Sequence, residues 1–439
     1  MLKRIEQVLP GEVLAADLMD PAGRLLFPKG ATLSESAIAA LGQRGVADVE
    51  IEDERVTLSA EQLRLAAEHA RRFYAGHDLG VPPGPILLGL RTEAEAQRIE
   101  RGLPPLLRDC RGPAGPVHLP RDLPMFCLAS FDPPQLAAVA QDLNLALSEP
   151  DPSSKKIVEI ITHSPGLTAK LLRLVNTPIY GFQGKVETVS RAVAIVGLRE
   201  VGMLASSLLM VDQFGVIPKS VIEMRTFLEH SLGCALTCKA LAESTGLAQP
   251  EQAFVAGLLH DIGRLYFFTS FPERSRYCID SALRHKRPLM TEEALFFGID
   301  HADMGERLLD GWRMPSGLSR TVGCHHDPAR ATGLPLAGIV HLADLLTHAM
   351  GLGCSGECGP PPMRPGFAAL LPLRPDQTAD VAARIAGQLD AIVAAFDCPD
   401  LQSEQARHSP PILAARVGSG NRALKDRRRA VVRDRNSFH

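Results

Sequence analysis

Seven residues in one half of the chain carry side chains that commonly bind metal ions. They are five histidines and two aspartates: His230, the adjacent pair His260 and Asp261, His301, the adjacent pair His325 and His326, and Asp344. Imidazole and carboxylate donors without thiolates suit divalent Fe, Mn, Zn, Ni or Co, whereas closed structural zinc sites are usually built on cysteines. The sequence therefore predicts a site for one or two transition-metal ions.

The stretch AFVAGLLHDIGRLYFF (253–268) places His260 and Asp261 side by side in an otherwise apolar helical run. Adjacent helical residues point about 100° apart, so the two side chains could converge only on an ion between their directions. The two oxygens of an aspartate can bridge two ions, which would activate a water and stabilise charge during attack on phosphorus. Burial of Asp261 without a cation or complete hydrogen bonding would be costly, and this favours a metal site over an ordinary core histidine.

A lone histidine on a helix is more often a hydrogen-bonded core or surface residue than a ligand. We assign the nine remaining histidines of the fourteen to that class, His348 among them. His341 lies three residues before Asp344 on the same side of the predicted helix, and it is a candidate to support a ligand by hydrogen bonding.

The elements that must position these residues are helices. Apolar residues recur at three- and four-residue steps from about 123 to 350, for example in PPQLAAVAQDLNLALS (133–148) and SKKIVEIITHS (154–164). Pro165 opens one predicted helix and Asn176 ends it, as is usual for these residue types. The fold class is therefore mainly all-α, with a multi-helix domain at 123–350.

Residues 1–53 predict a small α+β module ahead of that domain. Two short apolar stretches flank the turn signal DPAG and indicate paired strands. Thr32 and Glu35 form a predicted capping box that opens a helix over 33–45, and VADVEI (46–51) returns as a strand.

The remaining segments are connections and a tail. Residues 54–122 predict a helix near 57–75 and then a Pro/Gly-rich linker with one embedded helix at 92–101. Residues 351–400 predict a loop and a C-terminal helix. The basic tail at 401–439 is expected to be disordered, with contact to phosphates or an acidic partner as the alternative.

Cysteine pairs offer a second, weaker metal signal. Cys234 and Cys238 are spaced one helical turn apart and indicate small buried hydrophobes. Cys354 and Cys358 lie in the loop GLGCSGECGPPP, where they could hold zinc, but no second pair follows at zinc-finger spacing.

Composition excludes several protein classes. The 47 basic and 50 acidic residues give a net charge of -3, so the molecule as a whole has no general attraction to nucleic acid or anionic membranes. The start MLKRIEQVLPGEVL lacks the apolar core of a secretory signal, and no window reaches the roughly 18 apolar residues that span a bilayer. Nine scattered cysteines suit reduced thiols, and we expect a cytoplasmic protein.

Two motifs resemble a known family. SPGLTAKLLRLVNTPIYG (164–181) and AVAIVGLREV (192–201) are similar to the HDOD domain, the HD-related output domain of bacterial signalling proteins, over about 123–350. The order His, His-Asp and a final Asp on successive helices resembles the HD superfamily of metal-dependent phosphohydrolases. The full order His, His-Asp, His, His-His, Asp resembles the ligand set of HD-GYP enzymes. Residues 1–53 resemble the module that precedes HD-GYP domains, the relatives that hydrolyse cyclic di-GMP.

The resemblance implies roles for individual residues, but this sequence also departs from the family pattern. Asp261 would hold the catalytic metal, and Arg264 would steady a substrate phosphate where HD-GYP enzymes have a lysine. HHDPARATGLPLAG lacks the DGxGYP motif after the double histidine, and Thr226 replaces a glutamate found in some of these sites.

Three hypotheses follow for function. The first is a bacterial signal-transduction protein that retains a metal site and acts through an unknown protein partner or a nucleotide ligand. The alternative is a metal-dependent phosphodiesterase or phosphohydrolase that acts on a (cyclic di)nucleotide. The third is a regulator that binds nucleic acid through its basic tail.

Overall fold

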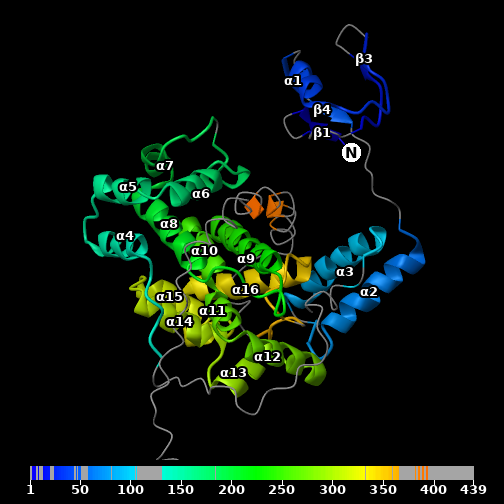
Figure 1. The fold of residues 1–439 in the computed structure, drawn as a ribbon. Coiled ribbons are helices and arrows are strands. Elements are labelled where there is room, and N and C mark those ends of the chain that lie inside the picture. The colour runs from blue at the N-terminus through cyan, green and yellow to red at the C-terminus, as the bar shows by residue number, and fades with distance from the viewer. Residues whose placement is uncertain are drawn as a thin grey trace, which may run out of the picture. The chain divides into compact units, whose positions relative to one another are not determined.

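The computed structural model describes residues 2–5, 8, 13–19, 24–43, 46, 48–50, 58–80, 82–103, 105, 131–182, 184–331, 333–357 and 359–364, with seven single positions between 381 and 393. The chain divides into two units, residues 1–63 and 64–439 (Figure 1). The tail at 401–439 and Cys358 lie outside the described residues, so the predictions made for them stay predictions.

The first unit is the predicted small α+β module. Its elements are β1 Leu2–Arg4, β2 Leu18–Met19, β3 Leu25–Phe27, α1 Glu35–Gln43 and β4 Asp48–Glu50. β2 pairs with β3 around the DPAG turn signal, and β4 pairs with β1, both antiparallel. The predicted Thr32 cap was wrong, because Thr32 bridges to Val13 and Ser34 Oγ accepts the hydrogen bond of Ala37 N at 3.2 Å.

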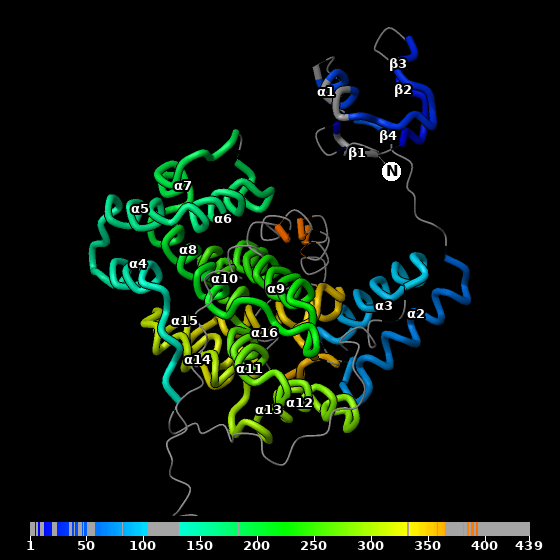
Figure 2. The backbone as a smooth tube through the Cα atoms, in the orientation of Figure 1, coloured from blue at the N-terminus to red at the C-terminus, as the bar shows by residue number. Residues whose placement is uncertain are grey.

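The second unit is helical in its described part, as predicted, and Figure 2 traces its path. Its helices are α2 Ala60–Phe73, α3 Gly84–Glu100, α4 Ala138–Ser148, α5 Ser154–Thr162, α6 Pro165–Val175, α7 Val189–Val196, α8 Leu198–Asp212, α9 Met224–Thr245, α10 Pro250–Leu259, α11 Ile262–Ser270, α12 Pro272–His285, α13 Leu289–Phe297, α14 His301–Gly311, α15 Ser316–Gly323 and α16 Pro335–Met350. Helix α9 packs against α10 and α16 at the centre (Figure 1). One apolar cluster joins the helices, and it includes the buried Cys234 and Cys238.

Helix α3 corrects the expectation of a linker with an embedded helix at 92–101. It spans 17 residues and packs on α16. Its buried Arg91 donates from Nη1 to the carbonyl oxygen of His348 at 3.0 Å and from Nε to Glu95 Oε1 at 3.1 Å. The run GVPPGPILLGL misled the prediction because Pro82 and Pro83 stand before the helix and Pro85 lies in its first turn, where proline is tolerated.

The NTPIYG segment is held by its asparagine. Asn176 follows α6 as its cap residue, as predicted. Its Nδ2 donates to the carbonyl oxygens of Leu172 at 2.7 Å and Val186 at 2.8 Å, and its Oδ1 accepts from Val186 N at 2.8 Å. One side chain thus closes the loop between α6 and α7, which accounts for this motif without a catalytic role.

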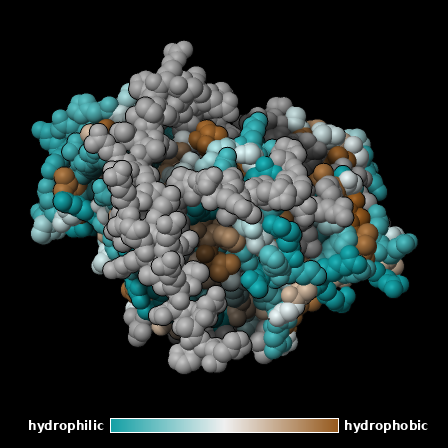
Figure 3. All heavy atoms as spheres, turned by 60° about the horizontal axis from the view of Figure 1, so that its bottom comes forward, coloured by the Kyte–Doolittle hydropathy of each residue, from teal (hydrophilic) through white to brown (hydrophobic). Residues whose placement is uncertain are grey.

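None of the described helices is both long and apolar enough to cross a bilayer. On the face drawn in Figure 3, apolar side chains form small groups among hydrophilic ones. Scattered apolar residues of this kind are normal on folded proteins.

Two glycines allow the helices around the central His-Asp pair to touch. A Cβ on Gly257 would lie 2.7 Å from Ala235 Cα, so α10 meets α9 there at backbone distance. A Cβ on Gly263 would lie 2.1 Å from the carbonyl oxygen of His301 and 2.7 Å from Gly305 N, which brings α11 onto α14. Both contacts fix helices that carry predicted ligands.

We expect Gly263→Ala to destabilise the protein by about 2–3 kcal/mol, because the added methyl must push α14 away from α11. The control is Gly166→Ala in α6, where a Cβ meets no atom within 4 Å. That change should leave stability within about 1 kcal/mol of the parent, in the stabilising direction. Urea unfolding measures both, and equal stabilities would contradict the packing argument.

Candidate metal centre

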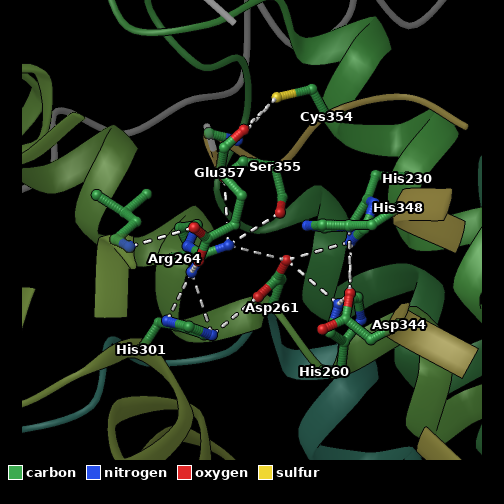
Figure 4. Close-up of polar contacts among 12 residues, drawn as sticks. His230, His260, Asp261, Arg264, His301, Asp344, His348, Cys354, Ser355 and Glu357 are labelled. Carbon is green, nitrogen blue, oxygen red and sulfur yellow. Dashed lines mark hydrogen bonds and ion pairs between the residues drawn. The ribbon is translucent and has the colours of Figure 1, made fainter. Parts of the chain in front are cut away.

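The structure brings all seven predicted ligands together from separate helices and from the turns that follow two helices. His230 lies in α9, His301 begins α14 and Asp344 lies in α16, while His260 and Asp261 follow α10 and His325 and His326 follow α15. Each of the seven is at most 4% exposed. Figure 4 shows five of them converging from different elements.

A break between two helices aims His260 and Asp261 at one point. The sequence suggested one continuous helical run, but α10 ends at Leu259 and α11 begins at Ile262. Asp261 takes φ -99° and ψ 16° at the break. His260 Nε2 consequently lies 3.2 Å from Asp261 Oδ2, a convergence that the 100° spacing of a continuous helix would oppose.

The carboxylate of Asp261 stands between two groups of donors. Its Oδ2 faces His260 Nε2 at 3.2 Å and His230 Nε2 at 3.7 Å, and Asp344 Oδ1 lies 3.3 Å from the same His230 nitrogen. Its Oδ1 faces His301 Nε2 at 3.1 Å. A single side chain therefore presents one oxygen to each group.

The second group consists of imidazoles. His301 Nε2 lies 2.9 Å from His326 Nε2 and 3.4 Å from His325 Nε2. The three residues offer nitrogens that all lie within 4.8 Å of one another. Three imidazole nitrogens and one carboxylate oxygen make a donor set that suits a first-row transition ion.

Unpaired buried atoms test whether an ion fits. His230 Nε2, His260 Nε2 and Asp344 Oδ1 are buried and have no hydrogen-bond partner. Leaving such atoms unpaired costs about 1–3 kcal/mol each. The opposite nitrogens are held from behind, since His260 Nδ1 lies 2.7 Å from the carbonyl oxygen of Gly257 and His325 Nδ1 lies 2.6 Å from that of Val322. This arrangement is typical of metal-ligating histidines, so the residues fit a cation.

The protonation states differ among the seven residues. Burial opposes ionisation of Asp261, but the Arg264 guanidinium and His260 outweigh it and hold the pKa of this carboxyl well below its usual range. Burial lowers the pKa of His325 to about 3, and burial with the neighbouring His325 holds the pKa of His326 well below its usual value. Burial opposes protonation of His260 and His301, but the nearby carboxylates of Asp261 and Glu293 outweigh it; the pKa of His260 lies well above its usual value and that of His301 rises to about 10. Metals bind ionised carboxylates and neutral imidazoles, so an ion would displace the protons of these two histidines.

Comparisons with known proteins concern the domain that carries most of these residues. Residues 134–328 match the HDOD domain family. The chain contains an HDOD domain. The match includes six of the seven predicted ligands, whereas Asp344 lies beyond its end. It also excludes residues 1–53, so the likeness of that module to those before HD-GYP domains stays a prediction.

Individual relatives are distant. An uncharacterized protein of Treponema pallidum (strain Nichols) is 26% identical over 197 residues, which are 45% of this chain and 38% of that protein. The chain thus spans well under half the length of this relative. A Shewanella amazonensis SB2B structure, a proposed phosphohydrolase, is 23% identical with 60% and 94% of the two chains covered and a TM-score of 0.49. An HDOD domain protein of unknown function from Geobacter sulfurreducens is 25% identical, with 63% and 92% covered and a TM-score of 0.45.

The guanidinium of Arg264, in the HDOD domain, forms hydrogen bonds with groups in the protein interior. Its Nε donates to Glu293 Oε1 at 2.9 Å, its Nη1 to Ser355 Oγ at 2.9 Å and its Nη2 to Glu357 Oε1 at 2.8 Å. It is 1% exposed, and its Nη1 also lies 3.4 Å from Asp261 Oδ2. These contacts leave the guanidinium no open side for the predicted contact with a substrate phosphate, and we assign it the positioning of Asp261.

Sequence reasoning missed four residues around the ligands. Glu293 faces His301 Nδ1, while Ser355 and Glu357 bind Arg264 from the loop after α16. The fourth is His348, which the sequence predicts to be an ordinary core or surface histidine; its Nδ1 lies 3.5 Å from Asp344 Oδ1. Its i, i+4 spacing from Asp344 was the available signal, because residues so spaced share a helix face.

His341 makes the kind of supporting contact predicted for it. Its Nδ1 lies 2.7 Å from the carbonyl oxygen of His325, so it holds the turn that carries the double histidine. Cys354 Sγ, in contrast, accepts from Gly356 N at 3.2 Å and lies outside the group of donors.

We expect Arg264→Met to destabilise the metal-free protein by about 3–5 kcal/mol, because it leaves several buried carboxylates without their cation. Arg287→Met is the control, since Arg287 is 55% exposed and 3.6 Å from Glu292. The free energy of unfolding of Arg287→Met should stay within about 1 kcal/mol of the parent value. Chemical denaturation measures both, and a small effect at Arg264 would refute its structural role.

Proposed function

We propose that this protein is a bacterial cytoplasmic regulatory protein whose HDOD domain binds two divalent transition ions and passes a signal to a protein partner. The observation that carries this proposal is the position of Asp261, which offers one oxygen to each of two groups of buried donors. His230, His260, Asp261 and Asp344 would hold the first ion, and Asp261, His301, His325 and His326 the second.

Ion binding would join elements that lie far apart in the sequence. The first position draws on α9, the α10–α11 break and α16, and the second on that break, α14 and the turn after α15. An ion that binds only the folded arrangement stabilises it, by about 4 kcal/mol at 1,000 times its dissociation constant. Bound ions would also supply Lewis acidity to any phosphate nearby. Metal occupancy can therefore set the relative positions of these helices, which is what a signalling domain needs.

Three features favour a regulatory role over catalysis. The seven proposed ligands are at most 4% exposed. Arg264, the cation nearest to Asp261 in the sequence, is bound by Glu293, Ser355 and Glu357. The segment after His325 and His326 lacks the motif of the cyclic di-GMP hydrolases.

The proposal predicts a separate dependence of each ion on its ligands. The protein purified with Mn²⁺ or Fe²⁺ should carry two ions, Asp261→Ala should lose both, and His260→Gln and His326→Gln should lose one each. His163→Gln, at an exposed position after α5, is the matched control and should keep both. Elemental analysis per mole of protein gives the counts, and circular dichroism confirms that each variant folds. Sub-stoichiometric metal in parent and Asp261→Ala alike would refute the metal centre.

The second candidate function is a metal-dependent phosphodiesterase, and the bridged pair of donor groups favours it. Two ions some 3.5–4 Å apart commonly clamp both oxygens of an in-line displacement at phosphorus. Within this candidate the substrate class is a (cyclic di)nucleotide.

We expect the metal-loaded protein to hydrolyse neither bis(p-nitrophenyl) phosphate nor cyclic dinucleotides faster than Asp261→Ala does, because the ligands are buried and Arg264 is engaged. Phosphate release and chromatography of the nucleotides measure this. Hydrolysis that requires both His260 and Asp261 would overturn the regulatory proposal in favour of the phosphodiesterase.

A further inference from the structure

His348 lies beside two of the proposed ligands, Asp344 and His230, although neither the family match nor the seven-residue pattern includes it. It lies one turn after Asp344 on α16, its side chain is 8% exposed, and its Nε2 is buried without a hydrogen-bond partner. Its ring meets that of His230 edge to face, with centroids 4.6 Å apart. A side chain so placed has no solvent to satisfy its nitrogens.

The distances around Asp344 suit a shared ion. Its Oδ1 lies 3.3 Å from His230 Nε2, 3.5 Å from His348 Nδ1 and 3.8 Å from His260 Nε2. Two donors that bind one ion at about 2.0–2.2 Å, with angles of roughly 100–120°, lie about 3.1–3.8 Å from each other. His230, Asp344 and His348 also offer donor atoms that all lie within 4.8 Å of one another.

The turn that carries His348 is fixed from outside the HDOD match. Arg91 of α3 donates from Nη1 to the carbonyl oxygen of His348 at 3.0 Å, and Arg91 itself is 2% exposed. Its guanidinium also contacts Glu95 and lies over the ring of Phe73. The last turn of α16 is therefore held in place by α3, which keeps His348 beside Asp344.

We infer that His348 is a fifth protein donor to the ion held by His230, His260, Asp261 and Asp344. This inference rests on the proposed function and concerns its first metal position only. The two positions then differ, since five side chains hold the first ion and four hold the second. The first ion has fewer places left for water or a phosphate, and it is the tighter and more slowly exchanging of the two.

Cobalt substitution of the full chain tests the inference. The parent, His348→Gln and the exposed control His163→Gln are loaded with Co²⁺, and binding is followed by competition with a chelator and by visible absorption. We expect all three to bind two ions, with His348→Gln weakened at least about 10-fold for the tighter one. In His348→Gln the visible absorption of the more tightly bound Co²⁺ should increase, because cobalt absorbs more strongly with four donors than with five. His348→Glu, which restores a donor of similar reach, should recover the affinity.

Three outcomes would overturn the inference. Affinity and spectrum unchanged in His348→Gln would remove His348 from the ligands. A third ion in the parent that His348→Gln lacks would assign His348 to a separate position instead of the shared one. If the parent binds no ion that Asp261→Ala loses, the proposed function is refuted as well. The first two outcomes leave the proposed function intact. Thermal unfolding of the metal-free variants shows whether a change in affinity reflects misfolding.

Discussion

The buried carboxylate of Asp261 is the constraint on which the centre depends. An ionised group that is 2% exposed must be compensated, and here compensation comes from a guanidinium on one side and imidazole groups on two others. Two close backbone contacts, at Gly257 and Gly263, hold the helices on either side of it. Packing and electrostatics thus act on the same short segment.

The side-chain type at position 264 decides how the positive charge beside Asp261 is used. A lysine presents a compact charge, whereas a guanidinium has a planar fork that can bind several carboxylates at once. In this chain the fork joins Asp261, Glu293 and Glu357 from three different elements. The positive charge of Arg264 therefore stabilises contacts within the protein and is not available to a substrate. This is the physical reason for proposing regulation ahead of catalysis.

Much of the fold was predictable because its signals are local. Helical periodicity identified the α-helical domain, and the turn signal between β2 and β3 identified their pairing. Predictions failed where one local sequence pattern is compatible with two different structures. Thr32 matched a capping box but entered a β-bridge, and the prolines before Gly84 looked like a linker although a 17-residue helix follows them.

The sequence by itself determined the donor types and their order along the chain, which fixes the chemistry that the centre can support. Only the tertiary structure decided which atoms meet. The break between α10 and α11, the burial of Arg264 among carboxylates and the approach of His348 to His230 all involve segments that lie apart in the sequence. Such contacts depend on packing among residues distant in sequence, and no local pattern encodes them.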